Sequence, residues 1–177
     1  MNVGVLAIQG AFIEHEKAFE HAGHTVFEIR QPKHLEQPID MIVFPGGEST
    51  VQRKLLNDLG LIAPIWARID AGVGVYATCA GLILLAREVD GKPNSLGRLD
   101  VSVQRNAYGR QLGSFQTHGP VLNHTDVAMT FIRAPKILSC APNVEILSTF
   151  DGYPTAVRQG KITAFAWHPE LNDAIYC

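Results

Sequence analysis

Cysteine is scarce in this chain, with only Cys79, Cys140 and Cys177 among 177 residues. The number is odd and no Cys-x-x-Cys pair occurs, which argues against a disulfide framework or a zinc knuckle, so we expect reduced thiols. Seven histidines are scattered along the chain. Two of them, His15 and His21, fall in a charged helical segment, where we expect exposed side chains rather than metal ligands. We therefore assign no metal.

Long apolar runs and an excess of charge of either sign are also missing. No stretch approaches the roughly 18 apolar residues that span a bilayer, and Met1 to Gln9 lack the basic region and cleavage site of a signal peptide. A cytoplasmic location is therefore expected. Fifteen basic residues against 17 acidic ones give a net charge of −2, which offers no broad attraction for nucleic acid or anionic membranes. We expect neither partner.

What the chain does have is enough apolar sequence for one globular domain over residues 1–177, with 46% hydrophobic and 18% charged residues. In the first half, short apolar strands alternate with helical segments; the strands are expected at 3–9, 25–29, 41–44 and 73–78, and the helices at 11–22, 49–57 and 61–71. This alternation predicts an α/β fold with a mostly parallel sheet covered by helices on both faces, a three-layer α/β/α architecture of the flavodoxin-like type. Sites in such folds form beyond the carboxyl ends of the strands.

The second half carries short β-like runs divided by Gly, Pro and Asn, at Leu99–Val103, Ala128–Ile132, Val144–Thr149, Pro154–Arg158 and Ile162–Ala166. We expect them to be antiparallel additions that make the sheet mixed. Asp151-Gly152 and Gln159-Gly160 are typical of tight hairpin turns. The last strands then form a meander that delivers Trp167 and His168 to the end of the sheet.

Cys79 lies where the apolar run 73–78 gives way to Ala80, Gly81 and a second apolar run, 82–85. A strand that turns abruptly into a helix lifts the side chain at the bend clear of the backbone and aims helix N-terminal amides at whatever it attacks. A thiolate at such a bend is a strong nucleophile. The alternative is a buried thiol that acts as a small core hydrophobe.

His168-Pro169-Glu170 follows an apolar strand and would place an imidazole and a carboxylate at the same sheet end as Cys79. Residues i and i+2 of an extended segment project the same way, and Pro169 restricts the backbone between them. Glu170 could then orient the ring while His168 removes the thiol proton. The alternative is an ordinary surface turn.

Pro45-Gly46-Gly47-Glu48-Ser49-Thr50 is a glycine pair after a buried strand. Glycine permits positive φ and lets a substrate approach the main chain closely. The backbone amides of Gly47 and Ala80 are the expected pair of donors for an oxyanion. The alternative is a glycine turn followed by a helix cap at Ser49 or Thr50. No lysine follows the glycines, as a phosphate-binding loop requires.

These segments carry a resemblance. Leu6-Ala7-Ile8-Gln9-Gly10, Gly46-Gly47-Glu48-Ser49-Thr50, Thr78-Cys79-Ala80-Gly81-Leu82 and His168-Pro169-Glu170-Leu171 resemble class I glutamine amidotransferases. More narrowly, Leu99-Asp100, Arg105-Asn106-Ala107-Tyr108-Gly109-Arg110-Gln111 and Phe131-Ile132-Arg133-Ala134-Pro135 resemble the glutaminase subunit of the two-component pyridoxal 5'-phosphate synthase. The similarity covers nearly the whole chain.

The resemblance implies that Cys79 attacks the side-chain amide of L-glutamine to form a thioester, that His168 gives a proton to the departing ammonia, and that Glu170 holds His168. Water then releases L-glutamate. It also implies that the glutamine pocket is formed by Gly46, Gly47, Glu48, Arg105, Ile132 and Arg133, and that Gln9 and Gly10 lie at the oxyanion loop and the partner interface.

The implied partner is a synthase subunit, a (β/α)8 barrel that receives the ammonia through a tunnel and builds pyridoxal 5'-phosphate, a form of vitamin B6. The glutaminase itself would need no cofactor. Two alternatives stay open: a glutaminase that serves another synthase, and a catalytically silent docking module of the same fold. Ala77, where the family usually has glycine, and the end of the chain at Cys177, where the family generally continues into a helix, motivate the silent module.

Overall fold

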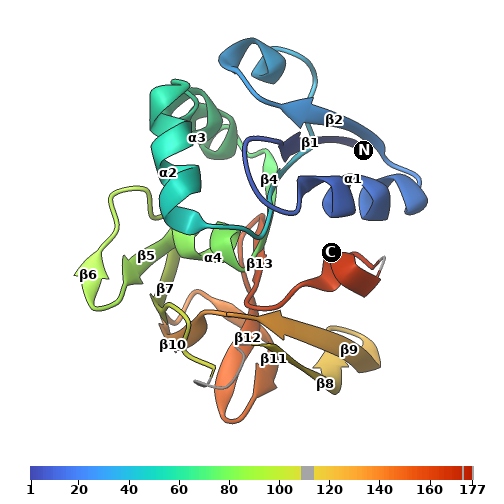
Figure 1. Cartoon of the computed structure of the whole chain (residues 1–177), viewed down its shortest axis with the longest axis vertical. Coiled ribbons are helices and arrows are strands. Elements are labelled where there is room, and N and C mark those ends of the chain that lie inside the picture. Colours follow the sequence, from blue (N-terminus) through green and yellow to red (C-terminus); the bar gives the residue numbers. More distant parts are fainter. Residues whose placement is uncertain (109–113, 173, 177) are drawn as a thin grey trace.

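A seven-stranded sheet runs through the computed structural model, which describes residues 1–108, 114–172 and 174–176 (Figure 1). Its strand order is β11-β12-β13-β4-β3-β1-β2, and the strands from β2 to β13 are parallel. Their bounds are β1 Asn2–Leu6, β2 Thr25–Ile29, β3 Met41–Phe44, β4 Gly74–Thr78, β11 Glu145–Phe150, β12 Tyr153–Gln159 and β13 Ile162–Phe165.

Helices cover both faces of this sheet. The crossover from β1 to β2 moves along the sheet in the opposite direction to that from β3 to β4, and right-handed crossovers of opposite direction lie on opposite faces. Thus α1 (Phe12–His21) packs on one face and α2 (Ser49–Asp58), α3 (Ile62–Asp70) and α4 (Ala80–Leu85) on the other (Figure 1). The predicted three-layer architecture is confirmed.

Burial on both faces explains why the central strands are continuously apolar. Val5, Ile42, Val75 and Phe165 are completely buried and belong to one core cluster. Short 3-10 helices complete the first and last parts of the chain, η1 at Pro32–Leu35 and η2 at Pro169–Asn172. No helix within the described ranges is long and apolar enough to cross a membrane.

The second half differs from the prediction. Within the described residues, only β11 and β12 are antiparallel additions to the main sheet; β13 pairs with β4 in parallel. The runs expected at Leu99–Val103 and Ala128–Ile132 form other sheets. One has the order β10-β7-β5-β6 and the other pairs β8 with β9; their bounds are β5 Ala86–Val89, β6 Lys92–Pro93, β7 Leu99–Gln104, β8 Ser114–Val121, β9 His124–Ile132 and β10 Lys136–Cys140. Alternating burial marks a strand but does not identify its partner strand.

Turn residues predicted the positions of the hairpin turns better than apolar runs predicted strand pairing. Asp151 and Gly152 join β11 to β12 with φ of 52° and 76°, the positive values of a tight hairpin turn, so this prediction is confirmed. The next turn lies at Gly160 and Lys161, one residue beyond the predicted position.

The predicted cap of α2 was wrong: Glu48 is the N-cap residue, and no side chain among the described residues caps this helix end.

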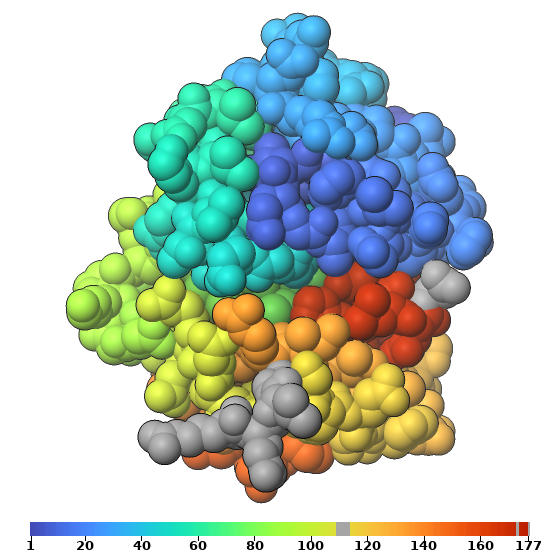
Figure 2. Space-filling model, viewed as in Figure 1, coloured from blue at the N-terminus to red at the C-terminus, as the bar shows by residue number. Residues whose placement is uncertain are grey.

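The C-terminal segment lies between the two halves of the molecule. Figure 2 shows it in red, in contact with the blue N-terminal part on one side and with the yellow and orange β8–β9 hairpin on the other. The contacts of η2 with α1 and with β9 agree with this view. Because β13 pairs directly with β4, the residues that follow both strands emerge at the same edge of the sheet.

Candidate active site

Cys79 occupies the bend between β4 and α4, as predicted. Its backbone has φ 47° and ψ −99°, a strained conformation for a residue other than glycine and one that clusters at functional sites. The Cys79 amide donates to the Phe165 carbonyl at 2.8 Å, which ties the bend to β13. A side chain at Gly81 would lie 2.2 Å from the Phe44 carbonyl oxygen, so only glycine lets α4 pack against the end of β3.

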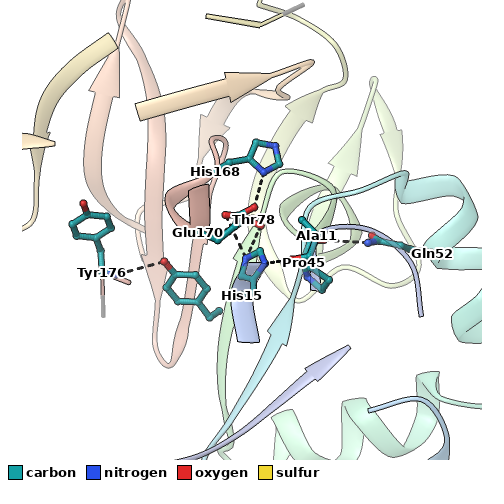
Figure 3. Close-up of polar contacts among 9 residues, drawn as sticks. Ala11, His15, Pro45, Gln52, Thr78, His168, Glu170 and Tyr176 are labelled. Atoms are coloured by element: carbon teal, nitrogen blue, oxygen red, sulfur yellow. Dashed lines mark hydrogen bonds and ion pairs between the residues drawn. The ribbon is translucent and has the colours of Figure 1, made fainter. Parts of the chain in front are cut away.

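The imidazole and the carboxylate of His168-Pro169-Glu170 do meet. Nδ1 of His168 lies 2.7 Å from Oε1 of Glu170 (Figure 3). The carboxylate accepts, so Nδ1 donates and Nε2 is left for the sulfur. The backbone amide of His168 donates to the Thr130 carbonyl at 2.9 Å, and Glu170 is only 2% exposed. Both side chains are therefore held in place by β9 and η2.

Charge on the pair follows from these contacts. Burial disfavours the imidazolium of His168, but hydrogen bonds with Cys79 and Glu170 outweigh it and raise the pKa of His168 to about 10. Burial likewise opposes ionisation of Glu170, yet the hydrogen bond from His168 and the charge on the His168 ring lower the pKa of that carboxyl. At neutral pH the protonated ring thus lies between an ionised carboxylate and the Cys79 sulfur, an arrangement that suits nucleophilic attack.

A cavity of about 350 Å³ opens in front of these residues. It brings together nine of the predicted site residues, namely Gln9, Gly46, Gly47, Glu48, Cys79, Arg105, Ile132, Arg133 and His168. The lining also includes Ala11, Ser49, Ile83 and Asn106, which sequence reasoning missed. Among the described residues, the predicted Gly10, Ala80 and Glu170 lie behind the lining rather than in it.

The glycine pair is held against the loop that follows β1. The Gly46 carbonyl accepts from the Ala11 amide at 2.9 Å. Since the carbonyl and N–H of a trans peptide point in opposite directions, the Gly47 N–H points away from Ala11, and β3, which this glycine pair follows, is the neighbour of β4 in the sheet. Ala80 begins α4, where a helix leaves its first amides without intrahelical partners. Both predicted oxyanion donors therefore lie on the elements next to Cys79.

Glutamine side chains fix the same loop. The Glu48 amide donates to Oε1 of Gln9 at 2.9 Å. From α2, Nε2 of the buried Gln52 donates to the Pro45 carbonyl at 3.1 Å (Figure 3). The same nitrogen donates to the Gln9 carbonyl at 3.0 Å. Nothing in the sequence pattern singled out Gln52. Gly10 has φ 98°, and a side chain there would lie 1.9 Å from the Gly46 oxygen, so close approach of the two loops requires glycine.

Opposite charges line the mouth of the cavity. A guanidinium nitrogen of Arg133, which follows β9 with φ 46°, lies 3.5 Å from the Glu48 carboxylate. Arg105 is held by Asp90, with 2.6 Å between its Nε and the carboxylate and 2.9 Å between its amide and the other oxygen. Such a combination suits a ligand that carries both an ammonium and a carboxylate group.

His15 corrects our prediction most sharply. We expected an exposed side chain, but His15 is completely buried, with Nε2 3.1 Å from Thr78 Oγ1 and 3.5 Å from Glu170 Oε2 (Figure 3). Its spacing with Ala18 and Phe19 places it on the buried face of α1. His21 is exposed, as expected. Gly109, Arg110, Gln111 and Cys177 lie outside the described residues.

Comparison with known proteins gives a consistent assignment. Residues 5–176 match the model of the SNO glutamine amidotransferase family. A relative from Methanocorpusculum labreanum, called pyridoxal 5'-phosphate synthase subunit PdxT, is 48% identical over 173 residues, which cover 98% of this chain and 92% of the relative. A protein of the same name from Bifidobacterium longum is 45% identical over 177 residues, 96% of this chain and 93% of the relative.

Solved structures agree. A crystal structure described as a glutamine amidotransferase has a TM-score of 0.90 and 40% identity, covering 97% of this chain and 92% of that one. A second glutamine amidotransferase, from Thermotoga maritima, has a TM-score of 0.66 at 17% identity over 96% of this chain and 76% of that one, a likeness of fold alone. With the fold, the cavity and these relatives in agreement, the chain belongs to the SNO glutamine amidotransferase family.

Proposed function

We propose that this chain hydrolyses L-glutamine to L-glutamate and ammonia with Cys79 as nucleophile, His168 as proton carrier and Glu170 as the group that orients His168. The observation that carries the proposal is the 2.7 Å bond between His168 and Glu170 at the back of the cavity that Cys79 lines. A nucleophile, a base and an orienting carboxylate in this order are the parts of a cysteine-based acyl transfer.

The reaction proceeds through a thioester. The Cys79 sulfur, its proton taken by Nε2 of His168, bonds to the amide carbon of glutamine, and the Gly47 and Ala80 amides stabilise the oxyanion that forms. Collapse of this intermediate breaks the C–N bond, and the His168 proton passes to the leaving ammonia. Water, deprotonated by His168, then attacks the thioester; glutamate leaves and the thiol is restored.

The charged mouth of the cavity recognises the amino-acid end of glutamine. In our proposal Arg105 and Arg133 bind the α-carboxylate, since a guanidinium can donate to both oxygens. Glu48 binds the α-ammonium group. Gly46, Gly47 and Ile132 line the path of the side chain, and the absence of side chains on the glycines lets the amide approach Cys79.

The ammonia is proposed to go to a pyridoxal 5'-phosphate synthase subunit, as the names of the relatives indicate. We further propose that this partner is a (β/α)8 barrel, that Gln9 and Gly10 lie near the interface with it, and that residues 1–177 act as one glutaminase domain. Docking would keep water away from the ammonia. A catalytic thiol must stay reduced, which favours the cytoplasm as the site of the reaction.

Glutamate release by the full chain, with and without the synthase subunit, tests this function. We expect turnover with the partner for the wild-type chain and a loss of at least about 1,000-fold for Cys79→Ala, because no other thiol of the described residues lines the cavity. Cys140→Ala is the matched control, since this thiol lies on β10 away from the cavity. Equal turnover by wild type and Cys79→Ala would refute the mechanism.

A further inference from the structure

His15 touches both halves of the proposed machinery. From α1 its Nδ1 lies 2.7 Å from the Ala11 carbonyl, and its Nε2 lies 3.1 Å from Thr78 Oγ1 and 3.5 Å from Glu170 Oε2 (Figure 3). Because the ring is completely buried, each of these contacts is shielded from water. A buried polar ring of this kind costs free energy unless its nitrogens are satisfied.

The contacts determine where the ring proton lies. A carbonyl oxygen only accepts, so Nδ1 carries the hydrogen that faces Ala11. In the neutral ring Nε2 then accepts from the Thr78 hydroxyl. Burial lowers the pKa of His15, although the nearby Glu170 carboxylate opposes this, and favours the neutral ring. Groups facing the ring are Glu170 from η2, Thr78 from β4 and, farther away, Glu14 and His168.

One oxygen of Glu170 lies against this neighbour. Oε1 accepts from His168, whereas Oε2 is buried without a hydrogen-bond partner among the described residues. Nε2 of His15 lies 3.5 Å from it; in the neutral ring this nitrogen carries no hydrogen, so the two atoms are in contact without a hydrogen bond. The position of the carboxylate, and through it that of His168, is therefore limited partly by packing against the ring from α1.

The other end of His15 leads to the oxyanion loop. Ala11 accepts from His15 through its carbonyl, and its own amide donates to Gly46 at 2.9 Å. That bond orients the peptide between Gly46 and Gly47. Gly46 in turn lies directly against His168, where an added Cβ would be 2.4 Å from Cε1. A closed path of contacts thus runs from Glu170 through His15, Ala11 and Gly46 back to His168.

We propose that His15 is a positioning residue that couples the orientation of the Gly46–Gly47 peptide to that of the Glu170–His168 pair. The proposal rests on the proposed glutaminase function. A loop displaced at Gly46 would then loosen the triad carboxylate, and a displaced carboxylate would loosen the loop. His15 acts through the bond from Nδ1 to the loop and through the Nε2 edge of its ring, which accepts from Thr78 and packs against Glu170, rather than by contact with glutamine.

Three substitutions of His15 distinguish the effect of each ring nitrogen from the effect of the size of the ring. His15→Phe keeps a ring but removes both. His15→Asn places an amide nitrogen where Nδ1 lies and retains the bond to Ala11, while His15→Gln reaches the position of Nε2 and retains the contact with Thr78 and Glu170. Phe19→Leu, on the same buried face of α1, is the control for lost packing alone.

Two rates are measured on the full chain with the synthase subunit present: kcat and KM for glutamine, and alkylation of Cys79 by iodoacetamide. Alkylation needs the His168–Glu170 pair but forms no oxyanion. For His15→Phe we expect kcat to fall about 10- to 100-fold with little change in KM, and alkylation to slow as well, because small displacements of reacting groups are this costly. His15→Gln should regain alkylation but not kcat, and His15→Asn should regain part of kcat but not alkylation.

Equal rates for wild type and His15→Phe would overturn the proposal. The proposal would also be overturned if the rates of all three His15 variants fell in proportion to their loss of melting temperature, as the rates of Phe19→Leu do. His15 would then contribute packing alone. If the wild-type chain shows no glutamine turnover, the proposed function fails; the alkylation rates, which need no glutamine, still decide whether His15 positions the pair.

Discussion

At Gly46, an added methyl group would lie 2.4 Å from Cε1 and 2.9 Å from Nδ1 of His168, and 3.6 Å from Cβ of Cys79. Real Cβ atoms do not approach other atoms so closely, so the imidazole would have to move. The ring is already held by the bond from Nδ1, one of the two atoms that the methyl group would approach, to Glu170. A single methyl group at this position therefore acts directly on the catalytic geometry.

Gly46→Ala should lower kcat for glutamine by about 100-fold or more, because a displacement of the base by about 1 Å is enough for such a loss. Steady-state glutamate release with the synthase subunit measures it. Gly119→Ala is the control, since a methyl group there meets only Cε of Met129, at 3.3 Å. An active Gly46→Ala enzyme would mean that His168 does not need its observed position.

Motifs were enough to propose a nucleophile and its partners because their chemistry is local: a cysteine at a strand–helix bend, and a histidine two residues before a carboxylate. His15 and Gln52 were not found, because their role depends on where the buried faces of α1 and α2 meet the loops after β1 and β3. Helical spacing placed His15 beside Ala18 and Phe19 and was the signal against exposure. A glutamine in a helix carries no comparable signal.

At the scale of elements, α4 depends on a side chain from outside itself. Nδ2 of the buried Asn94 donates to the carbonyls of Leu84 at 3.0 Å and Ala86 at 2.7 Å, at the end of the helix. Its Oδ1 accepts from Arg53 of α2 at 2.6 Å. One amide group thus satisfies the last carbonyls of the helix that begins at Cys79 and joins it to α2.

Asn94→Ala should lower the free energy of unfolding by about 2–4 kcal/mol, since it leaves buried carbonyls unpaired and opens a small cavity. Urea unfolding measures the loss. For comparison, Asn143→Ala removes one exposed bond to Asp100 of 3.1 Å and should cost less than about 1 kcal/mol. Similar losses for the two variants would contradict the role of Asn94.

Elements of the parallel core were predictable because strands buried on both faces have a continuous apolar pattern; β2 and β3 match the predicted bounds. Pairing in the second half was not, since Leu99–Gln104 alternates in burial as any half-buried strand does. Whether it joins the main sheet depends on β5 and β10, which flank it. The pairing of such a strand is decided by contacts between segments far apart in the sequence, and the local pattern of apolar residues carries no information about those contacts.

For the molecule as a whole, His168 links the active site to stability. Burial tends to lower its pKa, but the hydrogen bonds with Cys79 and Glu170 raise it to about 10, above the usual value of about 6.5 in an unfolded chain. A group whose pKa is higher in the folded chain than in the unfolded chain stabilises the folded state. This stabilisation is complete at pH values below the pKa of the unfolded chain. This contribution is lost as the pH rises from about 6.5 toward about 10.

Unfolding by urea at pH 6, 8 and 10 tests this dependence when wild type is compared with His168→Gln. We expect wild type to be the more stable at pH 6 and its advantage to shrink steadily toward pH 10, because the imidazolium is then lost from the folded state. Comparison of the two chains cancels the titration of shared lysines and tyrosines. An advantage that is constant or grows with pH would contradict the assignment.

The pairing of β13 with β4 has a consequence for how the protein is made. A ribosome adds about 5–20 residues per second, so a nascent chain carries the thiol of Cys79 for several seconds before His168 exists. During that interval the edge of β4 that β13 will cover is open, and no base activates the sulfur. Growing polypeptides thus cannot release ammonia prematurely, but their unprotected thiol is then most accessible to oxidants.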